Sequence, residues 1–191
     1  MDVSNFENAI KTATCLYTLE QVEAAIAKIG DSLNNEFADY ISESGVPAKD
    51  MALLTIMNGA MVFAGKLLPK LKFSIEVDYI HATRYGNGTQ GGALALLAEP
   101  KIELQGKTVL LVDDIFDDGI TIDRVKQYCL DRGAESVRTV VLAYKDKTRE
   151  GLAQLVSPPD FVGFNVPDKY VFGMGMDAEG LLRNAPGIYY F

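Results

Sequence analysis

Four aspartates follow a short apolar run in the middle of the chain. The apolar run is 109–112, and the acids are Asp113, Asp114, Asp117 and Asp118. Carboxylate oxygens accept hydrogen bonds from sugar hydroxyl groups, and they are hard ligands of the kind that Mg²⁺ needs. We therefore expect this segment to bind a ligand that carries hydroxyl groups, a divalent cation or both.

The residues after the aspartates add an anion-binding element. Gly119 lets the backbone approach a ligand closely, and Thr121 offers a hydroxyl group. Apolar residues then recur at Ile122, Val125 and Cys129, a spacing typical of one helix face. Because a helix N-terminus exposes unpaired N–H groups and the positive end of the helix dipole, it attracts anions. A sugar phosphate with a metal-bound pyrophosphate would satisfy both the amides and the acids.

The other reactive residue types exclude several mechanisms. His81 is the only histidine, which excludes a Ser-His-Asp or Cys-His mechanism and a site with several histidine ligands. Cys15 and Cys129 lack metal-ligand spacing, so we expect reduced thiols. Acid–base chemistry must therefore fall to carboxylates, lysines or tyrosines.

Composition narrows the class of protein. A chain of 191 residues suits one domain with a hydrophobic core. The net charge of −8 argues against a nucleic-acid partner, which would need clustered Lys and Arg. No apolar run approaches the roughly 20 residues of a membrane span. Residues 1–4 lack the basic start and apolar core of a signal peptide, so we expect a cytoplasmic location.

Local patterns predict alternating helices and strands. Thr18 and Gln21 fit a capping box at the start of a helix, and glycine-rich residues 84–92 predict a mobile loop. The predicted helices are 5–14, 18 to about 40, 61–71 and 122–133, and the predicted strands are 53–57, 75–81, 102–104, 109–112, 137–144, 161–164 and 170–172. Strands that alternate with helices indicate an α/β fold with a largely parallel sheet.

Two segments together resemble a known family. The run VLLVDDIFDDGITI at 109–122 resembles the phosphoribosyl pyrophosphate (PRPP) motif of type I phosphoribosyltransferases. The run PDFVGFNVPDKYVFGMGMD at 159–177 narrows the resemblance to the hypoxanthine-guanine enzymes. The resemblance extends from about Tyr17 onward. It implies one domain over 1–191, with a largely parallel central sheet flanked by helices, a small hood and a mobile loop.

The same resemblance implies an activity in purine salvage. Such an enzyme transfers the 5-phosphoribosyl group from PRPP to hypoxanthine or guanine, giving IMP or GMP and pyrophosphate. It uses Mg²⁺ and forms a homodimer or homotetramer. Two alternatives stay open: a related enzyme that prefers xanthine, and a PRPP-binding regulator without catalytic activity.

The resemblance also assigns roles around PRPP. Asp113 and Asp114 would bind the ribose hydroxyls or Mg²⁺, and residues 117–121 would hold the 5-phosphate. Asp117 would lie near purine N7 and act as the base. Asp118 and Ile120 depart from the family, which usually has threonine and lysine at these positions, and an acid beside a phosphate should weaken PRPP binding.

Further residues would bind the purine. Lys145 would donate to the 6-oxo group, although a solvated basic turn that includes Lys147 is an alternative reading. Lys169 is a second candidate donor to the 6-oxo group. Tyr170 would stack on the purine, and the Val171 backbone would read the edge of the base.

A last set would bind pyrophosphate and close the site. Asn58 and Gly59, with Arg183, would contact pyrophosphate, and a cis peptide bond is expected between Met57 and Asn58. Asn58 stands where the family commonly has lysine. Asp177 would hold a second Mg²⁺. Arg84 and Tyr85 lie in the loop that would close over the site.

Overall fold

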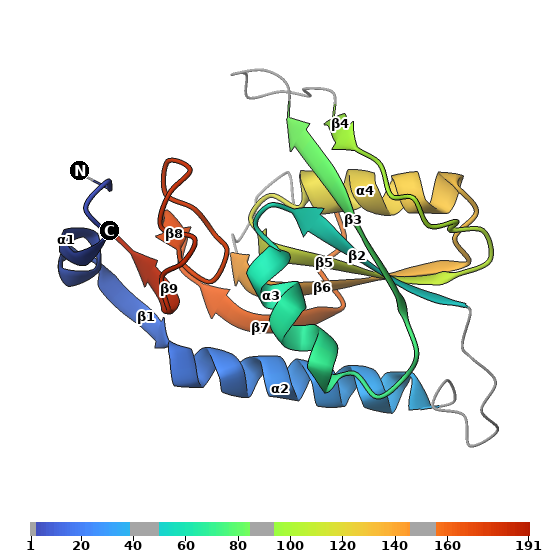
Figure 1. Cartoon of the computed structure of the whole chain (residues 1–191), viewed down its shortest axis with the longest axis horizontal. Helices are drawn as coiled ribbons and strands as arrows, with labels where there is room; N and C mark the ends of the chain where they lie inside the picture. The colour runs from blue at the N-terminus through green and yellow to red at the C-terminus, as the bar shows by residue number, and fades with distance from the viewer. Residues whose placement is uncertain (1–2, 39–49, 85–93, 146–155) are drawn as a thin grey trace.

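A six-stranded sheet forms the centre of the computed structural model, which describes residues 3–38, 50–84, 94–145 and 156–191. The strand order is β4-β3-β2-β5-β6-β7. The strands are β2 (Met51–Met57), β3 (Glu76–Arg84), β4 (Leu94–Ala98), β5 (Thr108–Phe116), β6 (Ser136–Lys145) and β7 (Phe161–Val166). All neighbours pair in parallel except β3 and β4. The expected α/β fold with a largely parallel sheet is therefore confirmed (Figure 1).

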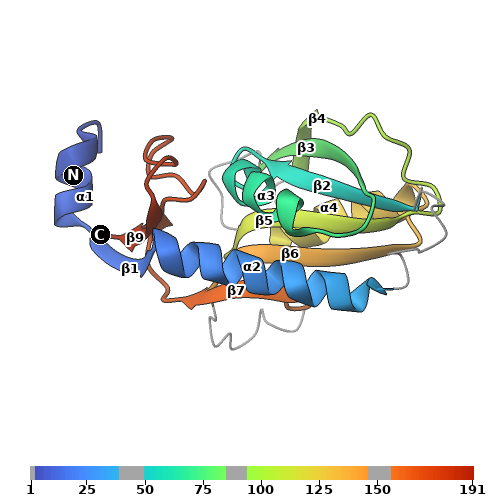
Figure 2. The same ribbon diagram turned by 60° about the horizontal axis from the view of Figure 1, so that its bottom comes forward.

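Helices cover both faces of this sheet. Helices α2 (Leu19–Glu36) and α3 (Met61–Leu67) lie on one face, and α4 (Ile120–Asp131) lies on the other (Figures 1 and 2). Alternate residues of β2 and β5 enter two separate cores: in β5, Leu110 packs in the α2 and α3 core, and Leu111 packs in the α4 core. Because the central strands are buried on both faces, they read as continuous apolar runs.

A small antiparallel sheet lies beyond one end of the central sheet and corresponds to the expected hood (Figure 1). Its strand order is β1-β9-β8, and helix α1 (Phe6–Thr12) precedes β1. The strands are β1 (Thr14–Thr18), β8 (Val171–Phe172) and β9 (Gly187–Tyr190). This sheet joins the two ends of the chain to the segment that follows β7.

Several predicted boundaries are wrong. Residues 102–104 do not form a strand; the N–H groups of Lys101 and Ile102 instead donate to the Asp78 carboxylate, at 2.6 and 3.1 Å. Strand β5 continues to Phe116, past its predicted end at 112. Helix α3 gives way to a 3-10 turn at Leu68–Lys70, where proline removes a backbone donor. Helix α2 ends at Glu36 rather than near 40.

The capping box at the start of α2 is confirmed. The Gln21 N–H donates to Thr18 Oγ1 at 3.3 Å, and the Thr18 N–H donates to the Gln21 side chain at 2.9 Å. We expect Thr18→Ala to lower the free energy of unfolding by about 1 kcal/mol, because the Gln21 N–H loses its side-chain acceptor. For a chain of this size that corresponds to roughly 2–4 °C in Tm by thermal unfolding. Thr18→Ser should stay close to wild type; an equal loss in both variants would contradict this reading.

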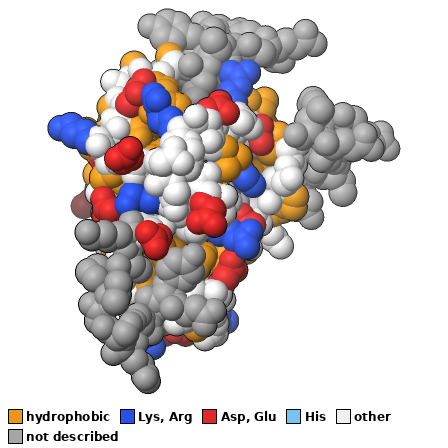
Figure 3. Space-filling model, turned by 90° about the vertical axis from the view of Figure 1, so that its right-hand side faces the viewer, with side chains coloured by type: hydrophobic (Ala, Val, Ile, Leu, Met, Phe, Trp, Pro, Cys, Tyr) orange, Lys and Arg blue, Asp and Glu red, His pale blue; other side chains and the backbone are white. Residues whose placement is uncertain are grey.

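Charged side chains of both signs are mixed on the end of the molecule opposite the hood (Figure 3). Lys107 pairs with Glu76 at 2.6 Å, and Arg138 pairs with Glu36 at 2.7 Å. Within the described ranges, none of the helices is both long and apolar enough to span a membrane.

Candidate functional site

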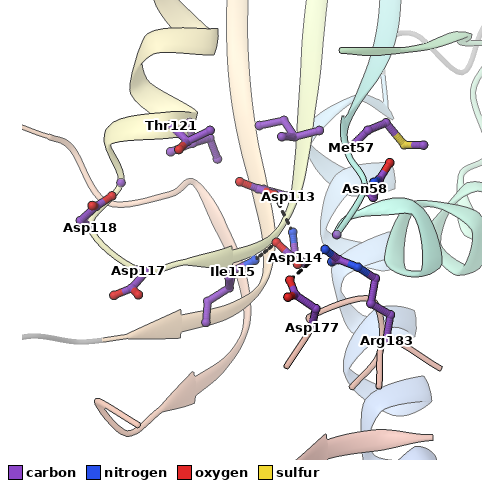
Figure 4. Close-up of a pocket in the computed structure, with 14 residues that line it drawn as sticks. Met57, Asn58, Asp113, Asp114, Ile115, Asp117, Asp118, Thr121, Asp177 and Arg183 are labelled. Atoms are coloured by element: carbon purple, nitrogen blue, oxygen red, sulfur yellow. Dashed lines mark hydrogen bonds and ion pairs between the residues drawn. The ribbon is translucent and has the colours of Figure 1, made fainter. Parts of the chain in front are cut away.

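A cavity of about 300 Å³ lies at the carboxyl-terminal ends of β2 and β5, where open α/β sheets bind ligands (Figure 4). Three elements meet there: the turn after β2, the end of β5 with the turn into α4, and the loop that follows β8. The lining residues are Ile56, Met57, Asn58, Gly59, Asp113, Asp114, Ile115, Asp117, Asp118, Gly119, Thr121, Ile122, Asp177 and Arg183. The structure thus brings together most of the residues that the sequence predicted for PRPP, pyrophosphate and metal.

Asp113, which is buried, and Asp114, which is partly buried, form a carboxylate pair within β5. The Asp114 N–H donates to Asp113 Oδ1 at 2.9 Å, and the Ile115 N–H donates to Asp114 Oδ1 at 2.8 Å. Burial raises the pKa of the Asp113 carboxyl well above its usual value, and the charge of Asp114 raises it further. Burial also raises the pKa of Asp114, although the charge of Arg183 opposes that shift. Ionisation of both carboxyl groups is therefore costly in this environment.

The turn after β2 packs directly against this pair. The Met57–Asn58 peptide bond is cis, as the resemblance implies. A Cβ atom on Gly59 would lie 1.9 Å from Asp114 Oδ2, and one on Gly175 would lie 2.0 Å from the Gly59 carbonyl oxygen. Both glycines therefore let three chain segments meet at the cavity without intervening side chains.

The turn from β5 into α4 forms the opposite wall. Gly119 has φ +76° and precedes the first residue of α4, so a glycine suits this left-handed position. The Ile120 N–H donates to Asp118 Oδ1 at 3.0 Å. Thr121 lines the cavity. Ile120 does not line it, and the Ile120 side chain is exposed. Asp118, Gly119 and Thr121 thus line this wall of the cavity, and the Asp118 carboxylate accepts the Ile120 N–H.

Asp177 and Arg183 close the cavity on the side of the hood. Arg183 Nη2 lies 2.8 Å from Asp177 Oδ1, and Arg183 Nη1 donates to the Gly175 carbonyl at 2.6 Å. The Gly180 N–H donates to the other Asp177 oxygen at 2.8 Å. The two predicted ligand-binding side chains, Asp177 and Arg183, therefore form an ion pair with each other (Figure 4).

Lys145 lies beside Asp117 rather than in a solvated turn. It is the last residue of β6, its side chain is only 9% exposed, and its Nζ donates to Asp117 Oδ2 at 3.1 Å. Asp168 Oδ1 lies 4.0 Å from the same ammonium group. The sequence singled out Lys145 and Asp117 separately but did not predict their contact, and it missed Asp168. The alternative residue Lys147 lies outside the described residues.

Among the described residues that were predicted to bind the purine, Lys169, Tyr170 and Val171 do not line the cavity. Tyr170 is 59% exposed, and Val171 is buried and pairs with Tyr190 in the small sheet. The Lys169 ammonium lies 5.8 Å from the centre of the Tyr190 ring. Arg84 ends β3, and Tyr85 and the predicted loop lie outside the described residues.

Comparisons with known proteins agree with this geometry. A family model described as a phosphoribosyl transferase domain matches residues 18–178. The hypoxanthine phosphoribosyltransferase of Escherichia coli K12 is 31% identical over 169 residues, which cover 88% of this chain and 89% of that protein. The hypoxanthine-guanine phosphoribosyltransferase of Mycobacterium avium is 28% identical over 170 residues, 88% of this chain and 80% of that protein.

Solved structures share the fold. The hypoxanthine phosphoribosyltransferase from Trypanosoma cruzi, in complex with the product IMP, has a TM-score of 0.81 at 23% identity and covers 94% of each chain. A hypoxanthine-guanine phosphoribosyltransferase from Bacillus anthracis has a TM-score of 0.80 at 24% identity, covering 93% of this chain and 98% of that chain. With the matching family model and the relative from E. coli, the central sheet and its cavity show that this chain belongs to the phosphoribosyltransferase family.

Proposed function

We propose that this chain transfers the 5-phosphoribosyl group from PRPP to N9 of hypoxanthine or guanine, releasing pyrophosphate and forming IMP or GMP. One observation carries the proposal: a single cavity joins a buried carboxylate pair, a helix N-terminus and the Arg183 guanidinium group. These three features suit the hydroxyl groups, the phosphate and the pyrophosphate of PRPP. The names of the relatives support the choice of base.

The cavity gives each part of PRPP a binding element. Asp113 and Asp114 would accept hydrogen bonds from the ribose hydroxyls, and the amides of 118–121 with the Thr121 hydroxyl would hold the 5-phosphate. The Asn58–Gly59 turn and Arg183 would contact pyrophosphate. As the bond from ribose C1 to pyrophosphate breaks and the bond to N9 forms, nearby carboxylates favour the positive charge on the sugar.

The purine would bind beside Asp117 and Lys145. Asp117 would accept the proton that the base loses, and Lys145 would donate to the 6-oxo group. A 6-amino group in that position would offer the Lys145 ammonium a donor in place of an acceptor, so adenine should be rejected. Tyr170 would stack on the ring, with the Val171 backbone and Lys169 as further contacts. The exposure of Tyr170 leaves its ring available for stacking.

The donor set fits Mg²⁺ bound together with substrate. The raised pKa values of Asp113 and Asp114 reflect a buried pair that a cation would stabilise as carboxylates. Within the described segments no three His, Cys, Asp or Glu side chains form a metal cluster. Mg²⁺ is often held by one or two carboxylates together with substrate phosphates. Asp113, Asp114 and Asp177 would provide the carboxylates, and PRPP would provide the phosphates. When bound, it would neutralise charge on the departing pyrophosphate.

Steady-state assays with PRPP and each of hypoxanthine, guanine, xanthine and adenine, with and without Mg²⁺, test this function. We expect Mg²⁺-dependent turnover with hypoxanthine or guanine and negligible turnover with adenine. Preference for xanthine would reassign the substrate. Tight PRPP binding without turnover on any base would instead support a regulator.

We also propose that the chain assembles as a homodimer or homotetramer and works in the cytoplasm. Three apolar side chains on neighbouring strands are about half exposed or more, namely Val77, Tyr79 and Leu97, and a second copy could cover them. Cys15 and Cys129 are unpaired thiols, as is usual in a reducing compartment. Sedimentation velocity tests the assembly, and a purely monomeric protein at assay concentration would refute it.

The departure at Asp118 gives a prediction about PRPP. Its carboxylate already occupies the Ile120 N–H, an amide proposed for the 5-phosphate, and its charge opposes that phosphate. We expect Asp118→Thr to lower the KM for PRPP about fivefold, the effect of about 1 kcal/mol at a helix N-terminus. Asp131→Asn, at the far end of α4, is the control and should leave this KM unchanged. A KM that stays the same or rises in Asp118→Thr would contradict the prediction.

A further inference from the structure

The Lys145 ammonium group faces two carboxylates that arrive from different elements. Asp117, after β5, lies 3.1 Å away and accepts a hydrogen bond. Asp168, after β7, lies 4.0 Å away, which is within ion-pair range but too long for a hydrogen bond. One buried cation therefore has a close partner and a second, more distant one.

The sheet register fixes the place of Asp168. Lys145 pairs with Val166 across β6 and β7, so the chain leaves β7 beside the lysine. A tight turn follows, in which the Lys169 N–H donates to the Pro167 carbonyl at 2.7 Å. Asp168 is 65% exposed, whereas the Lys145 side chain is 9% exposed. Asp168 thus reaches a buried cation from an exposed turn.

The proposed reaction requires the close pair to separate. Asp117 has to accept a proton from the purine, and Lys145 has to donate to the 6-oxo group. While Lys145 binds Asp117, the Asp117 carboxylate is not available to accept the purine proton, and the Lys145 ammonium is not available to donate to the 6-oxo group. A buried ammonium that loses its carboxylate pays a large desolvation cost, and a second carboxylate nearby lowers that cost.

We propose that Asp168 is a positioning residue that holds the Lys145 ammonium as it moves from Asp117 to the 6-oxo group of the bound purine. The inference rests on the proposed function and deepens it. In this role Asp168 contacts neither PRPP nor the base. Its effect should therefore appear in the binding of the base and should depend on Lys145.

Asp168→Asn tests this role in the full-length protein. We expect the KM for hypoxanthine to rise about fivefold to tenfold, the effect of about 1.0–1.4 kcal/mol, while the KM for PRPP stays within about twofold. Asp168→Glu should restore most of the affinity for the base. Asp131→Asn removes one exposed carboxylate from α4 and is the charge-matched control, with no expected change. Because Asp168 is exposed, Tm should stay the same.

A double-mutant cycle with Lys145→Met separates this role from a structural one. In the Lys145→Met background, Asp168→Asn should add no further loss; if turnover there is too slow, the Kd of IMP by calorimetry provides the same cycle. Equal losses in both backgrounds, or a parallel rise in the KM for PRPP, would overturn the inference. So would an active wild type with an unaffected Asp168→Asn variant. A wild type that converts no 6-oxopurine would instead refute the proposed function.

Discussion

Asp117→Asn should slow turnover by about 10²-fold or more while PRPP binding stays largely intact. Asparagine keeps the size of the side chain and one acceptor oxygen, but it carries no charge and does not take a proton at neutral pH. Asp117 lines the cavity and lies 3.1 Å from Lys145, at the proposed boundary between purine and ribose. PRPP should still bind, because its 5-phosphate would use the amides of 118–121.

Turnover and binding have to be measured separately. Steady-state rates with saturating hypoxanthine and PRPP give kcat, and calorimetry without a base gives the Kd of PRPP. Asp131→Asn removes the same charge at the far end of α4 and is the matched control; its kcat should stay close to wild type. A kcat for Asp117→Asn within about tenfold of wild type, or a large rise in the Kd of PRPP, would remove Asp117 from the role of base.

Most of the central sheet could be predicted because its signals are local, although the edge strand β4 was missed. Strands β2, β5 and β6 are buried on both faces and read as continuous apolar runs. Strands β1 and β9 were missed because they pair with each other from opposite ends of the chain, and the pairing includes an irregularity between Cys15 and Tyr17. Their stability comes from a distant partner, which a local pattern does not show.

The candidate site likewise contains residues that local sequence predicts and residues whose contacts depend on strand pairing. Asp113, Asp114 and Gly119 could be predicted because they follow one strand and precede one helix, so their place at the sheet edge is local. The contact of Lys145 with Asp117 depends on the pairing of β5 with β6, and the approach of Asp168 depends on the register of β6 with β7. The sequence offered one signal for Asp168: an acid in a proline turn close to a predicted site.

Asp113→Asn should make the protein without ligands more stable at neutral pH, although it removes a proposed substrate contact. Burial and the charge of Asp114 raise the pKa of Asp113 in the folded protein, so the native state binds this proton more tightly than the unfolded chain does. Stability is therefore greatest below the unfolded pKa of about 3.9 and falls as pH rises toward the native pKa. Asparagine cannot ionise, so the variant avoids this loss.

Urea unfolding in EDTA, without PRPP, across pH 4 to 7 tests whether Asp113→Asn raises or lowers the free energy of unfolding. The free energy of unfolding of Asp113→Asn should exceed that of wild type at pH 7, and the difference should shrink toward pH 4. Asp114→Asn should show a smaller gain, because hydrogen bonds from the Asp113 side chain and the Ile115 N–H, together with the charge of Arg183, oppose the shift of the Asp114 pKa. If Asp113→Asn were less stable than wild type at pH 7, or if its gain in stability did not change with pH, the raised pKa of Asp113 would be contradicted.

The same substitution should reduce activity. A hydrogen bond to a charged group contributes about 1.5–3 kcal/mol, so losing the Asp113 carboxylate should lower kcat/KM for PRPP by about 10- to 100-fold. Added PRPP and Mg²⁺ should then stabilise wild type more than the variant, because only wild type gains a partner for its buried charge. Asp113 would thus destabilise the empty fold and stabilise the loaded one. Equal stabilisation of both proteins by ligand would show that Asp113 does not contact PRPP or its metal.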